Sequence, residues 1–138
     1  MKTLDKLIRL HRYRLRERQK ALVALEAKAQ RLKGLADALE VEAAIEEANA
    51  GLSELGTFGF GAYLKRVQIE RERLHVAATE LAVHVNAARV ALRAAFAELK
   101  RIETLREQKR AAAQAEFKKR EQAALDEVAI TQHVRGDN

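Results

Sequence analysis

Apolar residues recur with a seven-residue period in two long segments of the chain. A heptad frame over residues 1–50 has apolar residues at twelve of its fifteen core positions, and a second frame over residues 64–102 has them at eleven of twelve. Neither segment shows the sustained two-residue alternation of a β-strand. The pattern predicts two long amphipathic helices, each with one apolar seam. Four polar residues interrupt the seams: His11, Arg18, Glu46 and Arg71.

Glycines between the two segments indicate where the chain reverses. Residues 51–61 read GLSELGTFGFG, and glycine is the residue that most readily adopts the backbone angles of a tight turn. The boundaries expected from this pattern are a helix over about residues 3–50, a glycine-rich turn over 51–61 and a helix over about 62–133. The predicted fold class is all-α, with residues 1–138 forming a single two-helix antiparallel coiled-coil hairpin.

The two seams match when the helices are paired antiparallel. Facing residues then have numbers that sum to 113 or 114, as in the pair Leu25 and Ala88. The second helix is the longer one, so its C-terminal part is predicted to overhang with no partner from the first helix. Beyond Leu105 the seam fades, and Phe117 is the only large apolar residue before Leu125.

The composition excludes most enzymes and several kinds of site. The chain has no cysteine, and its four histidines lack the i, i+4 spacing of metal ligands on a helix. The only serine, Ser53, has no histidine near it in sequence, and a two-helix hairpin offers no concave pocket for acid–base chemistry. We therefore expect no enzyme activity, no metal and no cofactor.

Charged residues also interrupt every candidate targeting segment. The N-terminal stretch carries a charge every two or three residues, unlike the apolar core of a signal peptide. The longest uncharged candidate for a membrane span, LGTFGFGAYL, is about half the required length. We therefore expect a cytoplasmic protein with no transmembrane segment.

The net charge of +6 is concentrated in two basic segments. Residues 2–20 and residues 100–120 each hold eight Lys and Arg side chains, whereas no basic residue lies between Lys33 and Lys65. Such segments are able to bind the phosphates of a nucleic acid. They lack the interleaved aromatic residues that stack on bases, so no nucleic acid is expected as a partner.

Three of the six aromatic residues lie at the predicted turn. They are Phe58, Phe60 and Tyr63. One interpretation is that they close the end of the coiled coil, and the other is that they form an exposed surface that binds a partner.

Two longer stretches resemble a known family. The stretches TLDKLIRLHRYRLRERQKALVALEA and ELKRIETLREQKRAAAQAEFKKREQAALDEVA are similar to the FliJ family of flagellar export proteins and its relatives in type III secretion. The resemblance implies an antiparallel coiled-coil hairpin similar to the central stalk of rotary ATPases. It also implies insertion into a hexameric export ATPase, whose assembly and activity the protein promotes, and contact with the export gate protein and with export chaperones.

The resemblance further implies which residues face the ATPase ring and where the protein acts. It places the protein at the cytoplasmic face of the export apparatus, and it has no counterpart for the GTFGFG turn. The implied ring-facing residues lie in the second helix: Arg106, Lys109, Arg110, Phe117, Arg120, Glu121, Gln122, Leu125 and Asp126. Two alternatives remain from the residues alone, a passive coiled-coil spacer or dimerisation module and a basic nucleic-acid-binding hairpin.

Overall fold

The computed structural model contains two long helices. It describes residues 2–52 and 54–136, without the side chains of residues 54–58. Helix α1 spans Lys2–Ala50 and helix α2 spans Glu54–Gly136, with lengths of 49 and 83 residues. The two helices pack against each other, and the described residues contain no strand. The predicted all-α helical hairpin is confirmed.

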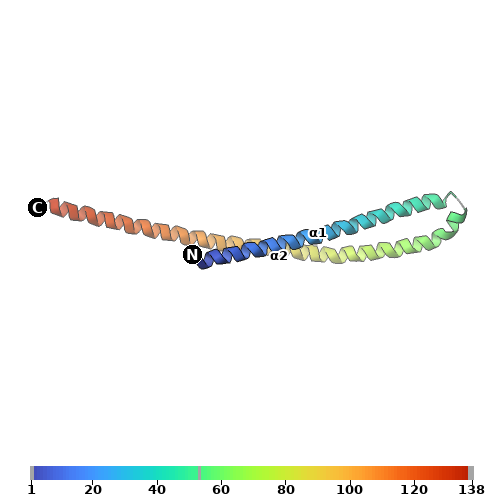
Figure 1. The fold of residues 1–138 in the computed structure, drawn as a ribbon, viewed down its shortest axis with the longest axis horizontal. Helices are drawn as coiled ribbons and strands as arrows, with labels where there is room; N and C mark the ends of the chain where they lie inside the picture. The colour runs from blue at the N-terminus through green and yellow to red at the C-terminus, as the bar shows by residue number, and fades with distance from the viewer. Residues whose placement is uncertain (1, 53, 137–138) are drawn as a thin grey trace. The chain divides into compact units, whose positions relative to one another are not determined.

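The structure divides into two compact units, and the first to consider is Arg14–Ala95. In this unit the two helices run in opposite directions from the turn (Figure 1). The α1 residues of this unit that are buried or half-buried all belong to the predicted seam, and Arg18 and Glu46, which interrupt the apolar pattern, are exposed. On α2 the same agreement holds at most positions, although Ala77 is half-buried where the frame predicted Ala78. The heptad seam is therefore the packing surface of this unit.

Ion pairs between α1 and α2 flank the seam and agree with the predicted register. Glu40 and Arg71 form a bidentate pair, in which Arg71 Nη2 donates to Glu40 Oε2 at 2.8 Å. Glu26 and Arg89 lie 3.5 Å apart. The residue numbers of these pairs sum to 111 and 115, which bracket the predicted 113 and 114. Arg71 is accommodated in the seam because its guanidinium reaches outward to a carboxylate.

The turn is shorter than the sequence analysis predicts. Helix α2 begins at Glu54, so the boundary expected near residue 62 is wrong by eight residues. The Gly51 N–H donates to the Glu47 carbonyl at 3.2 Å, and the Leu52 N–H donates to the Asn49 carbonyl at 3.1 Å. No described glycine has a positive φ, so the reversal does not use the backbone freedom that motivated the prediction.

Packing at the end of α1 gives a physical reason for the early start of α2. Extending α2 toward the turn brings Phe60 and Tyr63 alongside Ala50, with which they line one groove, and Ala50 is buried. Glycine inside a helix costs about 1 kcal/mol relative to alanine, and burial of apolar surface offsets costs of this size.

The second unit comprises Met1–Tyr13 and Phe96–Asn138. Leu4 and Ile8 of α1 are buried, as are Leu99 and Ile102 of α2, and all four belong to the predicted seams. Arg106 is the last residue of α2 that is even partly buried. The C-terminal part of α2 therefore extends beyond the apolar contact that α1 supplies.

Candidate partner-binding surfaces

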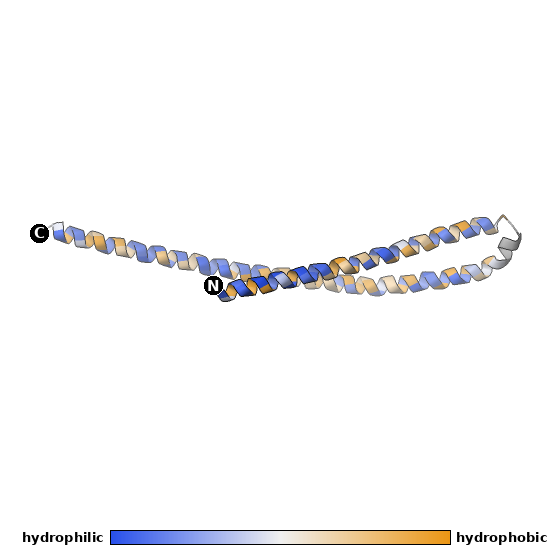
Figure 2. Cartoon of the chain, viewed as in Figure 1, coloured by the Kyte–Doolittle hydropathy of each residue, from blue (hydrophilic) through white to orange (hydrophobic). Residues whose placement is uncertain are grey.

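The C-terminal part of α2 is helical and has no cover from the described chain. Every residue from 107 to 136, which we call the exposed segment, is exposed. Hydrophobic and hydrophilic residues alternate along it (Figure 2). Its large apolar residues are well exposed, with Phe117 at 68% and Ile130 at 65%. An isolated helix in water gains little from propensity alone, so a surface of this kind favours packing against another protein.

Helix geometry divides the exposed segment into faces. At 3.6 residues per turn, residues 11 positions apart lie on nearly the same side of a straight helix. Phe117 and Val128 have this spacing, and so do Ala113 and Ala124. All four lie within about 40° of Phe117 around the helix axis. We call them, together with Arg110, the Phe117 face. The sequence analysis missed Ala113 and Ala124 as members of the candidate surface, although the 11-residue spacing was visible in the sequence.

The structure brings together only some of the residues implied by the family resemblance. Arg110 and Phe117 line a shallow surface groove with Ala113. Glu121 lies on the same side of the helix, about 40° from Phe117. Lys109, Arg120 and Leu125 lie farther around it, and Arg120 is ion-paired with Glu116 at 3.3 Å.

Gln122 and Asp126 lie on the opposite side of the helix from Phe117. The Gln122 side-chain amide donates to Asp126 Oδ1 at 3.0 Å. Because the two residues are one helical turn apart, this hydrogen bond stays within the helix surface. A single flat partner in contact with Phe117 therefore does not reach Gln122 or Asp126.

Arg106 has an intramolecular partner. Its Nε lies 2.7 Å from the Asp5 carboxylate, and the side chain is partly covered. The contact is an ion pair rather than an aligned hydrogen bond, because Nε has no acceptor in hydrogen-bonding geometry. Arg106 thus joins the first turns of α1 to α2 at the point where the exposed segment begins.

The turn end of the Arg14–Ala95 unit carries two described aromatic side chains. Phe60 and Tyr63 are half-buried and stack with ring centroids 6.2 Å apart. The Tyr63 hydroxyl is buried without a hydrogen-bond partner. Burial raises the pKa of Tyr63, and the nearby carboxylates of Glu42 and Glu46 raise it further. Phe58 lies outside the described side chains. Partner binding at this end stays a prediction, and the described rings cover the end of α1.

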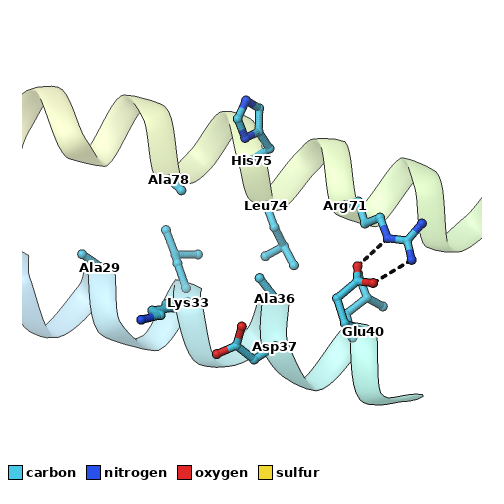
Figure 3. Close-up of a pocket in the computed structure, with 11 residues that line it drawn as sticks. Ala29, Lys33, Ala36, Asp37, Glu40, Arg71, Leu74, His75 and Ala78 are labelled. Atoms are coloured by element: carbon cyan, nitrogen blue, oxygen red, sulfur yellow. Dashed lines mark hydrogen bonds and ion pairs between the residues drawn. The ribbon is translucent and has the colours of Figure 1, made fainter. Parts of the chain in front are cut away.

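A groove that the sequence analysis did not anticipate runs between α1 and α2 in the same unit. It has a volume of about 350 Å³, and small residues such as Ala29 and Ala36 form part of its lining. Figure 3 shows Leu74 projecting toward α1 beside Ala36, with the Glu40–Arg71 pair at one end. The hydrogen bonds from Arg71 hold the pKa of Glu40 below its usual value. The paired seams leave this space because alanine side chains are too short to fill it.

Two further kinds of site were sought among the described residues. Residues 2–52 and 54–136 contain no cluster of three or more His, Asp or Glu side chains that would hold a metal ion. Within the same ranges, neither helix has a stretch that is apolar over the length needed to cross a bilayer. The charged side chains described above are exposed or paired with each other.

Comparison with known proteins identifies the family. A family model described as flagellar FliJ protein matches residues 1–138, the whole length of the chain. Searches of curated proteins and of solved structures gave no match. A match over the full chain shows membership, so the resemblance stated from the sequence is confirmed. The chain belongs to the flagellar FliJ protein family and is a component of the flagellar export apparatus.

Proposed function

We propose that this protein is the central-stalk component of the export apparatus. In this proposal the exposed segment enters the hexameric export ATPase and promotes its assembly and activity. The protein acts at the cytoplasmic face of the apparatus, links the ATPase to the export gate protein and to export chaperones, and performs no catalysis of its own. Family membership supports the setting, and the exposed segment supports the mechanism.

The observation that carries the proposal is thirty consecutive exposed residues, 107–136, in a helix that is otherwise paired. The segment keeps Phe117, Leu125, Val128 and Ile130 on a surface that α1 does not cover. Its charge changes along its length: residues 107–120 hold five basic and two acidic side chains, and residues 121–136 hold one basic and three acidic. A charge gradient of this kind orients a helix relative to a partner, because complementary charges steer association more than they add affinity.

Deleting residues 114–138 tests the role of the exposed segment. The seam contacts end at Arg106, so we expect the truncated protein to keep its helical circular dichroism and remain folded. We expect it to lose stimulation of ATP hydrolysis by the purified export ATPase. Stimulation equal to that of the full chain would show that the exposed segment is not the element that engages the ring.

Point substitutions separate the two sides of the exposed segment. We expect Phe117→Ala to reduce stimulation of the ATPase at least several-fold, because truncating a central buried aromatic contact is among the costliest changes at an interface. Ile130→Ala is the matched control, since Ile130 is nearly as exposed as Phe117 and lies on the opposite side of the helix. Equal losses from both substitutions would contradict docking through the Phe117 face.

Charge reversals test the electrostatic part of the proposal. Arg110→Glu on the Phe117 face should weaken stimulation at low salt, with a smaller difference at high salt because exposed charges are screened. Lys119→Glu, on the opposite side, is the control with the same change in net charge. Retardation of DNA measured in parallel covers the nucleic-acid alternative, and strong retardation at physiological salt without ATPase stimulation would replace the proposal.

A further inference from the structure

Helix α1 carries a second seven-residue repeat on its outer surface, opposite the seam. The repeat has the alternating spacing of three and four residues that marks a coiled-coil contact. Its members are Arg31, Gly34, Ala38, Val41, Ile45 and Ala48, which we call the Ile45 stripe. All six are exposed, with Val41 at 61% and Ile45 at 55%. This side of a two-helix coiled coil is normally polar, and a helix that is apolar on two opposite sides is normally covered on both.

Gly34 is a member of the stripe that the hairpin itself does not explain. It lies in the interior of α1, where glycine costs about 1 kcal/mol relative to alanine. Its φ is not positive, and a Cβ added to it would meet no atom within 4 Å apart from its chain neighbours and the adjacent helix backbone. Neither an unusual backbone angle nor a close contact within the chain therefore requires glycine here. Close approach of a second molecule is the use of glycine that remains.

The order of large and small residues along the stripe is complementary to itself when reversed. If two stripes run antiparallel and the numbers of facing residues sum to 79, Ile45 faces Gly34 and Val41 faces Ala38. Arg31 then faces Ala48. Each layer combines one large and one small side chain, the arrangement in which facing helices interdigitate. The stripe therefore fits a second copy of itself.

Charges along one edge of the stripe favour the same arrangement. Lys28 and Arg31 lie toward one end of this edge. Glu42 and Glu46 lie on the same edge toward the other end, and none of the four has an ion-pair partner in the described part of the chain. When a two-fold axis relates two antiparallel helices, the same edge of each copy meets, so the basic end of one copy lies beside the acidic end of the other. Arg31 and Glu46 of the second copy then differ by only about 3 Å in height along the helix axis.

We propose that two copies of this protein associate through the Ile45 stripe, with their α1 helices antiparallel and a two-fold axis between Ala38 and Val41. A two-fold contact uses the same patch on both subunits. Helix α2 packs on the seam, on the other side of α1, so it leaves the stripe open to the second copy. The inference is independent of the proposed function, because the stripe lies in the Arg14–Ala95 unit and the exposed segment does not.

The size of this contact sets its strength. Residues 31–48 span about 26 Å of helix, and a contact about 10 Å wide buries roughly 300 Å² per copy, less than the roughly 800 Å² of a standard interface. The dimer is therefore weak, with a dissociation constant on the order of 100 µM.

Sedimentation equilibrium of the full chain tests the association, at concentrations from about 10 µM to about 1 mM around the expected dissociation constant. We expect a monomer–dimer equilibrium, and we expect Ile45→Lys to weaken it by about tenfold or more. Val83→Lys is the matched control, because Val83 is 65% exposed and lies on the outer surface of α2. Association beyond a dimer, or equal effects of the two substitutions, would overturn the proposal. A chain that stays monomeric to about 1 mM would also overturn it and would assign the stripe to a different protein.

A size exchange tests the register. Ala38→Val should weaken the dimer by crowding two valines into one layer, and Val41→Ala should weaken it by leaving a gap, each by about two- to tenfold. The double variant should restore the dimer, because each layer again combines one large and one small side chain. No rescue by the double variant would contradict the pairing of these two positions.

Cysteine cross-linking tests the direction of the helices, since the chain has no native cysteine. In a mixture of Gly34→Cys and Ile45→Cys proteins we expect a disulfide between the two variants. Identical positions lie about 16 Å apart along the axis in this register, too far for a disulfide within either variant alone. Disulfides that form within each variant instead would indicate parallel helices and would refute the antiparallel contact.

Discussion

Two glycines near the turn test directly where α2 begins. Gly59 and Gly61 lie inside α2, neither has a positive φ, and a Cβ added at either position would have no atom within 4 Å apart from its chain neighbours and the adjacent helix backbone. Alanine in place of glycine restricts the unfolded chain and suits the helix, so it stabilises a helix interior by about 1 kcal/mol. We therefore expect Gly59→Ala and Gly61→Ala each to raise the free energy of unfolding.

The magnitude follows from the position of these glycines near the first turns of α2. We expect each substitution to raise the free energy of unfolding by about 1 kcal/mol or somewhat less, because helix ends fray. For a chain of this size, 1 kcal/mol corresponds to a rise of about 3–5 °C in the unfolding midpoint. Gly34→Ala in the middle of α1 is the matched control, since a Cβ there also has space beyond its chain neighbours and the adjacent helix backbone.

Urea titration followed by helical circular dichroism measures these differences. If all three variants are stabilised, residues 59–61 are helical and the turn is short. If Gly34→Ala stabilises while Gly59→Ala and Gly61→Ala destabilise, these glycines need a conformation that alanine does not adopt. That result would restore the turn over residues 51–61 that the glycine pattern suggests and would refute the reasoning from the structure.

Three further predictions concern the Arg14–Ala95 unit. Leu25→Cys combined with Ala88→Cys should form an intramolecular disulfide, whereas closure of Leu25→Cys with a cysteine two turns farther along α2 instead would disprove the register. The pKa of Glu40 is lower in the folded state than its ordinary value of 4.5, because Arg71 donates hydrogen bonds to the carboxylate. This pair therefore stabilises the fold above pH 4.5, and the stabilisation is lost as the pH falls through the lowered pKa. Arg71→Gln should remove this dependence of the urea midpoint on pH, and an unchanged dependence would show that other carboxylates cause it. Tyr63→Phe should not lower the urea midpoint, because the deleted hydroxyl has no partner, and a clear decrease would show that the hydroxyl is hydrogen-bonded in solution.

The packing of the helices could be predicted because it follows from periodicity. A seven-residue apolar repeat forms a stripe along one side of a helix, and this stripe is stable only when it is covered. Two such stripes in one chain cover each other by packing together. Arg18 shows how specific this signal is, since the frame marks it as an interruption and the structure leaves it exposed. Arg71 was marked in the same way, but its ion pair with Glu40 could not be predicted without the register.

The turn could not be predicted because glycine gives two opposite signals. It permits unusual backbone angles, and it also fits inside a helix at a cost of about 1 kcal/mol. The sequence does not show which applies to Gly59 and Gly61. The contact of Phe60 and Tyr63 with the end of α1 favours the helical conformation. This contact depends on tertiary packing, which the local sequence does not show.

At the candidate site, the family resemblance named a set of residues, and the contacts in the structure distinguish their roles. The residues that the resemblance implied lie in or beside the exposed segment. The resemblance did not separate their roles. Arg106 is tied to Asp5, so replacing it would loosen the first turns of α1 whether or not a partner contacts it. Arg110, one turn farther on, has no ion pair in the described chain and lies beside Phe117. A loss of ATPase stimulation with Arg110→Glu therefore reports on docking, whereas the same loss with a substitution of Arg106 reports on docking and on the hairpin together.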